Sequence, residues 1–261
     1  MVINRHDGVL ALPFLKTARA LVISLKFTEM AEYLASKSGN SHSSILRGQA
    51  LDTVADYLYA ESGYGKQWVR QKIIECFEKK HGTVKRPPGQ AHGIMTMIKW
   101  RTIFTTNYDR LIEIAHESSR DCVQRVLPIY TPDAQMRRHE VEVARLIKLN
   151  GSVDKAARNS SHELVLTFAD QQEARSRNSE FYDLLREEAI NGPIIFVGFS
   201  FTYPGARNVG TSPEFSLLQE ILREMGPAAR WHYFVTPFDP SSADSNFILR
   251  KLHAIQIKVD W

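Results

Sequence analysis

The sequence has very few cysteines, and this excludes several classes of site. Only Cys76 and Cys122 occur among 261 residues, and neither has a second Cys or a His at metal-ligand spacing. A four-cysteine zinc site and a disulfide-stapled scaffold both need more thiols than this. We therefore expect two reduced thiols in a cytoplasmic protein that binds no metal.

Long hydrophobic runs and dense clusters of one charge are also missing. No apolar stretch approaches the ~20 residues that a helix needs to cross a bilayer, and the N-terminus does not have the pattern of a secretory signal. The formal net charge is +4 and the pI is about 9.0, but the Lys and Arg residues are spread along the chain. We expect neither a membrane span nor direct nucleic-acid binding.

The first 99 residues have a mostly helical pattern. Apolar residues recur at helical spacing, and one predicted helix ends with cations in its last turn and Gly82 just beyond. The elements expected in this part are helices at 51–60, 66–80 and 90–99, and a loop at 38–44.

From residue 100 to 261, predicted strands alternate with predicted helices, which favours an α/β fold. Such alternation is typical of a mostly parallel sheet with helices on both faces. The strands are expected at 100–106, 124–130, 144–149, 193–200, 231–237 and 254–259, with helices at 108–117, 169–190 and 213–225, a short extended segment at 163–168 and a loop at 208–213.

Three of the predicted strands end in polar or glycine-bearing segments. Asn107 follows the first, residues 150–152 (Asn-Gly-Ser) follow the third, and residues 198–200 (Gly-Phe-Ser) end the fourth. Each also has a simpler interpretation, as a helix cap, a turn or a bend. Because the carboxyl ends of parallel strands share one edge, the three together predict a common pocket. Its amides, hydroxyls and backbone N–H groups suit ribose hydroxyls and phosphate oxygens.

Four segments, in this order and at this spacing, resemble the sirtuin-like domain of bacterial NAD-consuming proteins. They are TTNYDRLIE (105–113), LIKLNGSVD (146–154), LVLTFAD (164–170) and IIFVGFSFTYP (194–204). The resemblance covers about residues 90–261. It implies a Rossmann-like core at 100–261 with residues 1–99 as a helical part of the same domain, and NAD as the substrate whose nicotinamide–ribose bond is cleaved. Many members of the family act in anti-phage defence, so a regulatory protein partner or a homo-oligomer is expected here.

The resemblance also implies roles for individual residues. Asn107 takes the place of the family's asparagine, which lies beside the nicotinamide ribose and positions water. Asn150 stands where the family normally has the histidine that acts as general base. Asp109 is either a cofactor-binding residue or a residue that favours the first turn of its helix. The residues implied to bind the cofactor are Thr105, Thr106, Asp109, Gly151, Ser152, Gly198, Phe199 and Ser200.

The chain departs from the family pattern at two places. The carboxamide of Asn150 cannot accept a proton at neutral pH, and loss of a general base typically costs about 10²–10⁴ in rate. The start of the chain has only Gly8 where the family has a strand and a Gly-Ala-Gly loop, so the first strand is missing or rebuilt. A module that binds NAD, a related nucleotide or a partner without turnover therefore remains an alternative. His116, predicted on a solvated helix face, and His162 are the candidate substitute bases.

Overall fold

The computed structural model of the chain describes residues 2–5, 27–61, 63–80, 88–133, 140, 142–153, 164–197, 220, 223–224, 232–236 and 254–258. Its centre is a seven-stranded sheet with the order β3-β4-β2-β1-β5-β6-β7. The strands are β1 (Val2–Arg5), β2 (Trp100–Thr105), β3 (Arg125–Ile129), β4 (Val143–Lys148), β5 (Ile194–Val197), β6 (His232–Thr236) and β7 (Ala254–Lys258).

The sheet is mostly parallel, with one antiparallel strand at its centre. β2 pairs with β4, β4 with β3, β5 with β6 and β6 with β7, all in parallel. β1 runs antiparallel to both of its neighbours, and its Val2 lies opposite Phe104 of β2 and Phe196 of β5. β2 and β5 therefore point the same way and end at the same edge.

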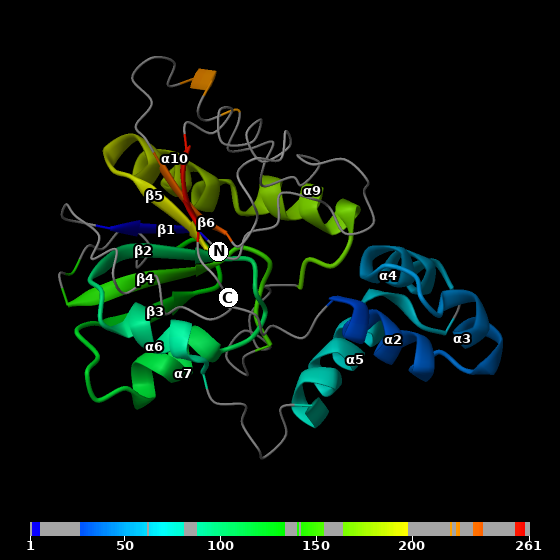
Figure 1. Cartoon of the computed structure of the whole chain (residues 1–261). Coiled ribbons are helices and arrows are strands. Elements are labelled where there is room, and N and C mark those ends of the chain that lie inside the picture. Colours follow the sequence, from blue (N-terminus) through cyan, green and yellow to red (C-terminus); the bar gives the residue numbers. More distant parts are fainter. Residues whose placement is uncertain are drawn as a thin grey trace.

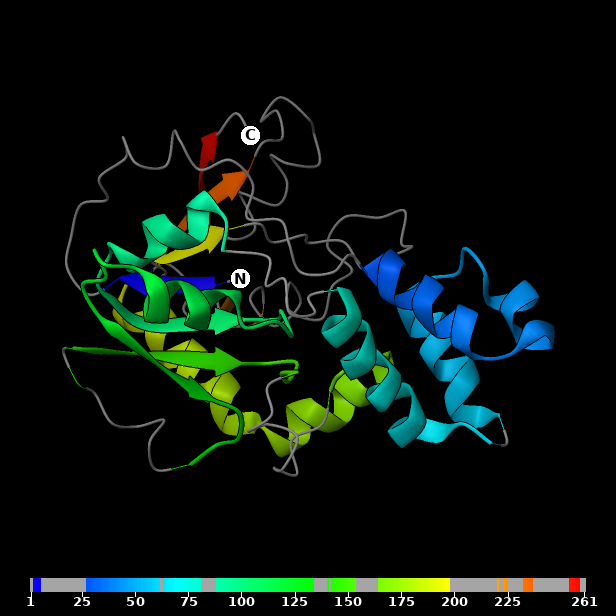
Figure 2. The ribbon, with the colours of Figure 1, turned by 90° about the horizontal axis from the view of Figure 1, so that it is seen from below.

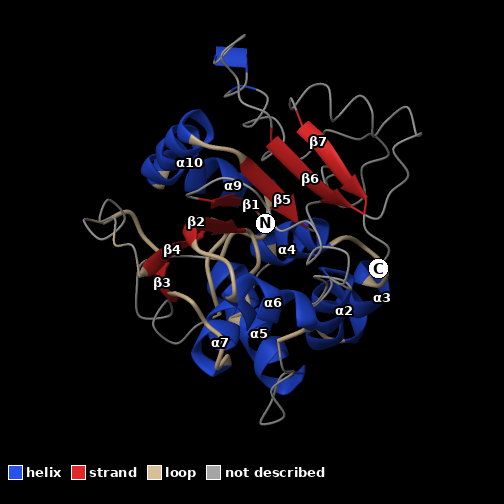
Figure 3. Cartoon of the chain, turned by 60° about the vertical axis from the view of Figure 1, so that its left-hand side comes forward, coloured by secondary structure: helices blue, strands red, loops and turns tan. Residues whose placement is uncertain are grey.

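Helices cover both faces of the sheet. α6 (Gln90–Thr96) and α7 (Leu111–Ser118) lie on one face, and α10 (Ser179–Asn191) lies on the other (Figures 1 and 3). α9 (Phe168–Arg177), just before α10, extends past the ends of the strands (Figure 1). Because side chains alternate along a strand, Ile103 and Leu146 pack with Ile112 of α7, whereas Thr102 contacts Glu188 of α10. Burial on both faces explains the continuous apolar run of β5, Ile194–Val197.

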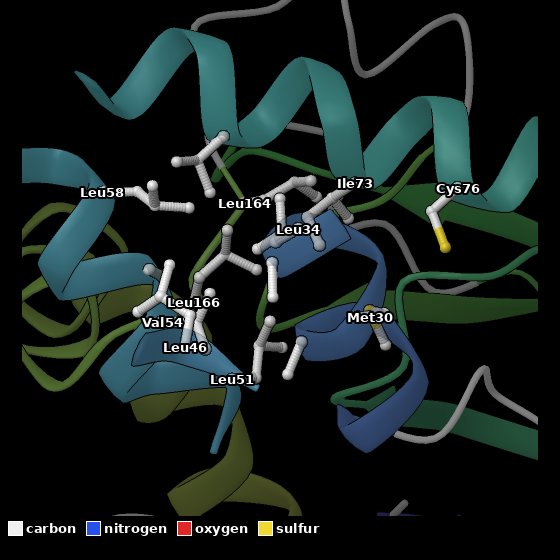
Figure 4. Packing of buried hydrophobic residues seen from close by; sticks show 14 of the residues in the cluster. Met30, Leu34, Leu46, Leu51, Val54, Leu58, Ile73, Cys76, Leu164 and Leu166 are labelled. Carbon is white, nitrogen blue, oxygen red and sulfur yellow. The ribbon is translucent and has the colours of Figure 1, made fainter. Parts of the chain in front are cut away.

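A separate group of four helices precedes β2 in the sequence. These are α2 (Phe27–Lys37), α3 (Asn40–Leu46), α4 (Leu51–Ala60) and α5 (Gly65–Lys80). Figure 2 shows the arrowheads of β2 and β4 directed toward this group. Its core also takes in Leu164 and Leu166, which come from the segment before α9 and lie among side chains of the helices (Figure 4). That segment therefore joins the helical group to the α/β core.

The predicted α/β class, with its mostly parallel sheet and helical N-terminal region, is confirmed. The loop expected at 38–44 is wrong, because α3 begins at Asn40. This helix buries little besides Leu46, so its polar sequence carries almost no helical periodicity, and its packing on α2 was not visible from the sequence. A first strand is present as β1, but it is antiparallel. Gly8, the loop expected at 208–213 and most of the helix expected at 213–225 lie outside the described residues.

Candidate functional site

Asn107 and Asn150 leave the sheet at the same edge from neighbouring strands. β2 and β4 are parallel, with Thr105 opposite Lys148, so the residues that follow each strand emerge side by side. β5 ends at Val197 at this edge as well. The predicted residues Gly198, Phe199 and Ser200 lie outside the described residues.

The turn after β2 is shaped by its own side chains. The backbone N–H of Asn107, which is half-buried, donates to Thr105 Oγ1 at 3.1 Å. Asp109 Oδ1 accepts the N–H of Leu111, the first residue of α7, at 3.0 Å. The interpretation of Asn107 as the helix cap is therefore wrong, because Asp109 supports the first turn in its place. Thr106 follows β2 directly and is half-buried.

The turn after β4 is more deeply buried. Asn150 is only 8% exposed, and its carbonyl accepts the N–H of Val165 at 3.1 Å. Gly151 has a φ of +87°, in the left-handed region that side chains with a Cβ rarely adopt. The Ser152 hydroxyl donates to the carbonyl of Tyr108 at 3.3 Å. The Asn-Gly-Ser sequence thus makes a tight turn whose hydroxyl reaches across to the neighbouring turn.

Backbone hydrogen bonds join the two turns. The N–H of Leu149 donates to the carbonyl of Thr105 at 2.9 Å, and the N–H of Val153 donates to the carbonyl of Tyr108 at 2.9 Å. With the Ser152 contact, three hydrogen bonds connect segment 105–108 to segment 149–153. A ligand at this edge would therefore meet one connected frame rather than two independent loops.

Sequence reasoning missed three residues of this frame. Tyr108 is buried, belongs to the core of the helical group and donates its hydroxyl to the carbonyl of Val165 at 2.5 Å. Lys148 and Glu113 form a buried ion pair with Nζ 3.0 Å from Oε1, and Lys148 Nζ also donates to the carbonyl of Asp109. The available signal was a lysine at the end of a strand that is covered on both faces.

A second polar cluster lies where the helical group meets α9. Asp170 accepts hydrogen bonds from Tyr59 Oη at 2.8 Å and from the N–H groups of Leu166 and Thr167, and Lys66 Nζ lies 3.1 Å from it. Burial by itself would raise the pKa of the Asp170 carboxyl. The hydrogen bonds from Leu166, Tyr59 and Lys66 outweigh burial and hold that pKa below its ordinary value.

The histidines considered as substitute bases do not complete the site. His116 is buried, not solvated as expected, and its Nδ1 lies 2.9 Å from the carbonyl of Ile112 in its own helix. Burial lowers its pKa below the ordinary value, although that carbonyl and Glu113 act in the opposite direction. His162 lies outside the described residues.

The two turns bring amide and hydroxyl side chains to one edge of the sheet, but they contain no histidine. Within 105–109 and 148–153 the titratable side chains are Tyr108, Asp109 and Lys148, and each makes one of the hydrogen bonds or ion pairs above. In the part of the chain that the structure describes, no group of three His, Cys, Asp or Glu residues could hold a metal ion. No described helix is both long and apolar enough to cross a membrane.

Comparison with known proteins places this arrangement in a family. The family model for the SIR2-like domain matches residues 101–259, which includes both turns. The protein named NAD(+) hydrolase ThsA from Cytobacillus dafuensis is 25% identical over 190 residues, covering 70% of this chain and 32% of the relative. The protein of the same name from Bacillus cereus (strain MSX-D12) is 26% identical over 155 residues, covering 59% of this chain and 30% of the relative. The chain thus spans about a third of the length of these relatives. Because the family model covers well over half of its residues, the chain belongs to the SIR2-like domain family.

Proposed function

We propose that this chain binds NAD at the edge formed by the ends of β2 and β4 and hydrolyses the nicotinamide–ribose bond. The observation that carries the proposal is the frame that joins the Asn107 turn to the Asn150 turn through three hydrogen bonds. Support also comes from two relatives named NAD(+) hydrolase, at about a quarter identity.

In this proposal Asn107 acts through its side-chain amide, which orients the attacking water beside the nicotinamide ribose. The bond between nicotinamide and ribose breaks through an oxocarbenium-like state, and water adds to the ribose carbon. Holding water and ribose in line supplies rate by positioning alone. Asn150 can hold a ribose hydroxyl but cannot take its proton at neutral pH. The remaining predicted contacts come from Thr105, Thr106, Asp109, Gly151, Ser152 and residues 198–200.

A second candidate function is favoured by Asn150 itself. An amide at the position where the family normally has a histidine base leaves the frame able to bind NAD or a related nucleotide without turning it over. The expected rate penalty for a missing base is about 10²–10⁴, so such a chain would cleave little of the NAD that it binds.

Nicotinamide release by the unaltered chain separates the two candidates, because product from it would eliminate the binding module. We expect the Asn150→His variant to release nicotinamide from NAD, measured by chromatography, about 10²–10⁴ times faster than the unaltered chain. Asn107→Ala in the same background should abolish the gain, whereas Asn191→Ala, at an exposed position at the end of α10, should leave it unchanged.

Calorimetry on the same proteins completes the test. Saturable NAD binding without nicotinamide release, with or without a candidate partner, would favour the binding module. Absence of both binding and release would refute both candidates.

For the biological setting, we place the protein in anti-phage defence in the cytoplasm, where NAD consumption would be switched on by a partner protein or by self-assembly. The support is the family resemblance. Phage should form fewer plaques on a lawn of cells that express the unaltered chain than on a lawn that expresses Asn107→Ala. Equal plaque counts, at equal protein levels and with the candidate partner present, would count against this role.

A further inference from the structure

Lys148 is the last residue of β4, and its charge is buried where an apolar residue would complete the strand. The side chain is 1% exposed, and so is that of Glu113 on α7, whose Oε1 lies 3.0 Å from Lys148 Nζ. Removing two charges from water is costly, and a buried ion pair is weak evidence of a contribution to stability. The place of this pair therefore calls for a reason other than packing.

The pair connects the two turns of the candidate site. Lys148 stands two residues before Asn150, and its Nζ donates to the carbonyl of Asp109, two residues after Asn107. Glu113 lies in the first turn of α7 and holds the same ammonium. One side chain thus ties the backbone that leads to Asn150 to the backbone that leaves Asn107.

The other hydrogen bonds between the two turns fall at other places. The N–H of Leu149 donates to the carbonyl of Thr105 at 2.9 Å, which lies before Asn107, whereas Lys148 reaches the backbone after Asn107. The hydrogen bonds that the N–H groups of Asn107 and Leu111 donate stay within the turn between β2 and α7 and do not reach β4. Ser152 and Val153 reach Tyr108 from the far side of the Asn150 turn. Lys148 and Leu149 thus hold the Asn150 turn from the near side, at the carbonyls of Asp109 and Thr105, and the Ser152–Val153 segment holds it from the far side.

We propose that Lys148 and Glu113 are a positioning pair, which sets the place of Asn107 relative to Asn150. The ligand of the site rests on the proposed function, whereas the positioning itself rests on the contacts above. A displacement of about 1 Å at a reacting centre can lower the rate about 10²-fold. The pair therefore acts on the reaction through Asn107 and Asn150 without touching the ligand.

The chain offers a matched control on the same strand. Arg145 of β4 forms a second buried ion pair, with its Nη2 2.6 Å from Oε1 of Glu188 on α10. Both side chains are at least nine-tenths buried. The pair lies on the opposite face of the sheet, three residues before Lys148, and Glu188 also contacts Thr102 and Arg101 of β2. Arg145→Met thus breaks a buried pair of β4 without acting on the site edge.

The first measurement needs no ligand. We expect Lys148→Met and Glu113→Gln to speed hydrogen exchange at the amides of Asn107, Leu111 and Val153 by about tenfold or more, because local opening becomes easier. Arg145→Met should not speed hydrogen exchange at these amides more than at other amides. Glu113→Gln keeps a neutral hydrogen-bonding side chain and serves if Lys148→Met does not fold. The positioning role would be overturned if the exchange rates of these three amides, relative to the other amides of the chain, were the same in all variants.

The second measurement uses NAD. In the Asn150→His background, Lys148→Met and Glu113→Gln should lower kcat for nicotinamide release about 10- to 100-fold with a smaller change in KM, since positioning matters most in the transition state. Arg145→Met should change kcat less than threefold. Unchanged kcat and NAD affinity in Lys148→Met would overturn the link to function. If the parent neither binds nor cleaves NAD, the proposed function fails, and the exchange data still decide the positioning role.

Discussion

Replacing Asp170 by asparagine should weaken the junction between the helical group and the α/β core. Asp170 Oδ2 accepts three hydrogen bonds, from Tyr59 Oη and from the N–H groups of Leu166 and Thr167. The carboxyl is 3% exposed. An amide oxygen in the same place would keep the three contacts but lose the negative charge, and its NH₂ group would face the Lys66 ammonium.

The magnitude follows from those three bonds. A hydrogen bond to a charged group contributes about 1.5–3 kcal/mol and a neutral one about 0.5–1.5 kcal/mol, a difference of about 1 kcal/mol per bond. Neighbouring bonds are not additive, so we expect the free energy of unfolding to fall by about 2–3 kcal/mol. For a chain of this size the Tm should fall by about 4–12 °C. Lys66 is left out of this sum because it is more than one-third exposed and screened by water.

Thermal and urea unfolding of Asp170→Asn, compared with Glu173→Gln, test this estimate. Glu173 lies on the same helix and pairs with the same lysine at 3.2 Å, but it is 57% exposed, so its loss should cost less than about 0.5 kcal/mol. Indistinguishable effects of the two substitutions would refute the reasoning. Because the pKa of Asp170 is lowered in the folded state, its contribution is complete above the ordinary value of 3.8 and is lost as the pH falls below it. The difference in free energy of unfolding between the unaltered chain and Asp170→Asn should therefore shrink as the pH falls below 3.8.

Three further predictions concern the frame and its helix. Tyr108→Phe leaves the buried carbonyl of Val165 without its 2.5 Å donor, so unfolding in urea should show a loss of about 1–3 kcal/mol; an unchanged midpoint would contradict the contact. Gly151→Ala must place a Cβ at a φ of +87° and should cost about 1–2 kcal/mol, whereas Gly93→Ala, with open space at its Cβ, should cost nothing comparable. The pKa of His116 is lowered by burial, so its NMR signals should titrate below 6.5, and stability should be retained above that value and fall below it; titration above 6.5 would show that the ring is not buried as described.

Strands β4 and β5 were predictable because each gathers several apolar residues within a short segment. Residues 194–197 form a continuous apolar run, and residues 144–148 place Ala144, Leu146 and Ile147 around Arg145; both became buried strands. The shorter elements were not predictable in the same way. The four-residue strand β1 and the polar helix α3 depend on the sheet and on α2 for their partners, so local sequence carries little information about either.

The same distinction between predictable and unpredictable features applies to the candidate site. That Asn107 and Asn150 emerge at one edge follows from parallel strand order, which the alternation of strands and helices indicates. The polar contacts that fix the edge join residues far apart in the chain. The sequence does not indicate that Lys148 pairs with Glu113 or that Asp170 pairs with Tyr59. The prediction that His116 lies on a solvated helix face was wrong, because the side chain is buried.

The most direct test of the central claim is a crystal structure of the unaltered chain grown with saturating NAD. We predict electron density for the dinucleotide between the turns at 105–108 and 148–153, with the nicotinamide ribose beside Asn107 and a ribose hydroxyl within hydrogen-bond distance of the Asn150 amide. Density at another surface, or an empty edge at an NAD concentration that saturates binding in solution, would contradict the account.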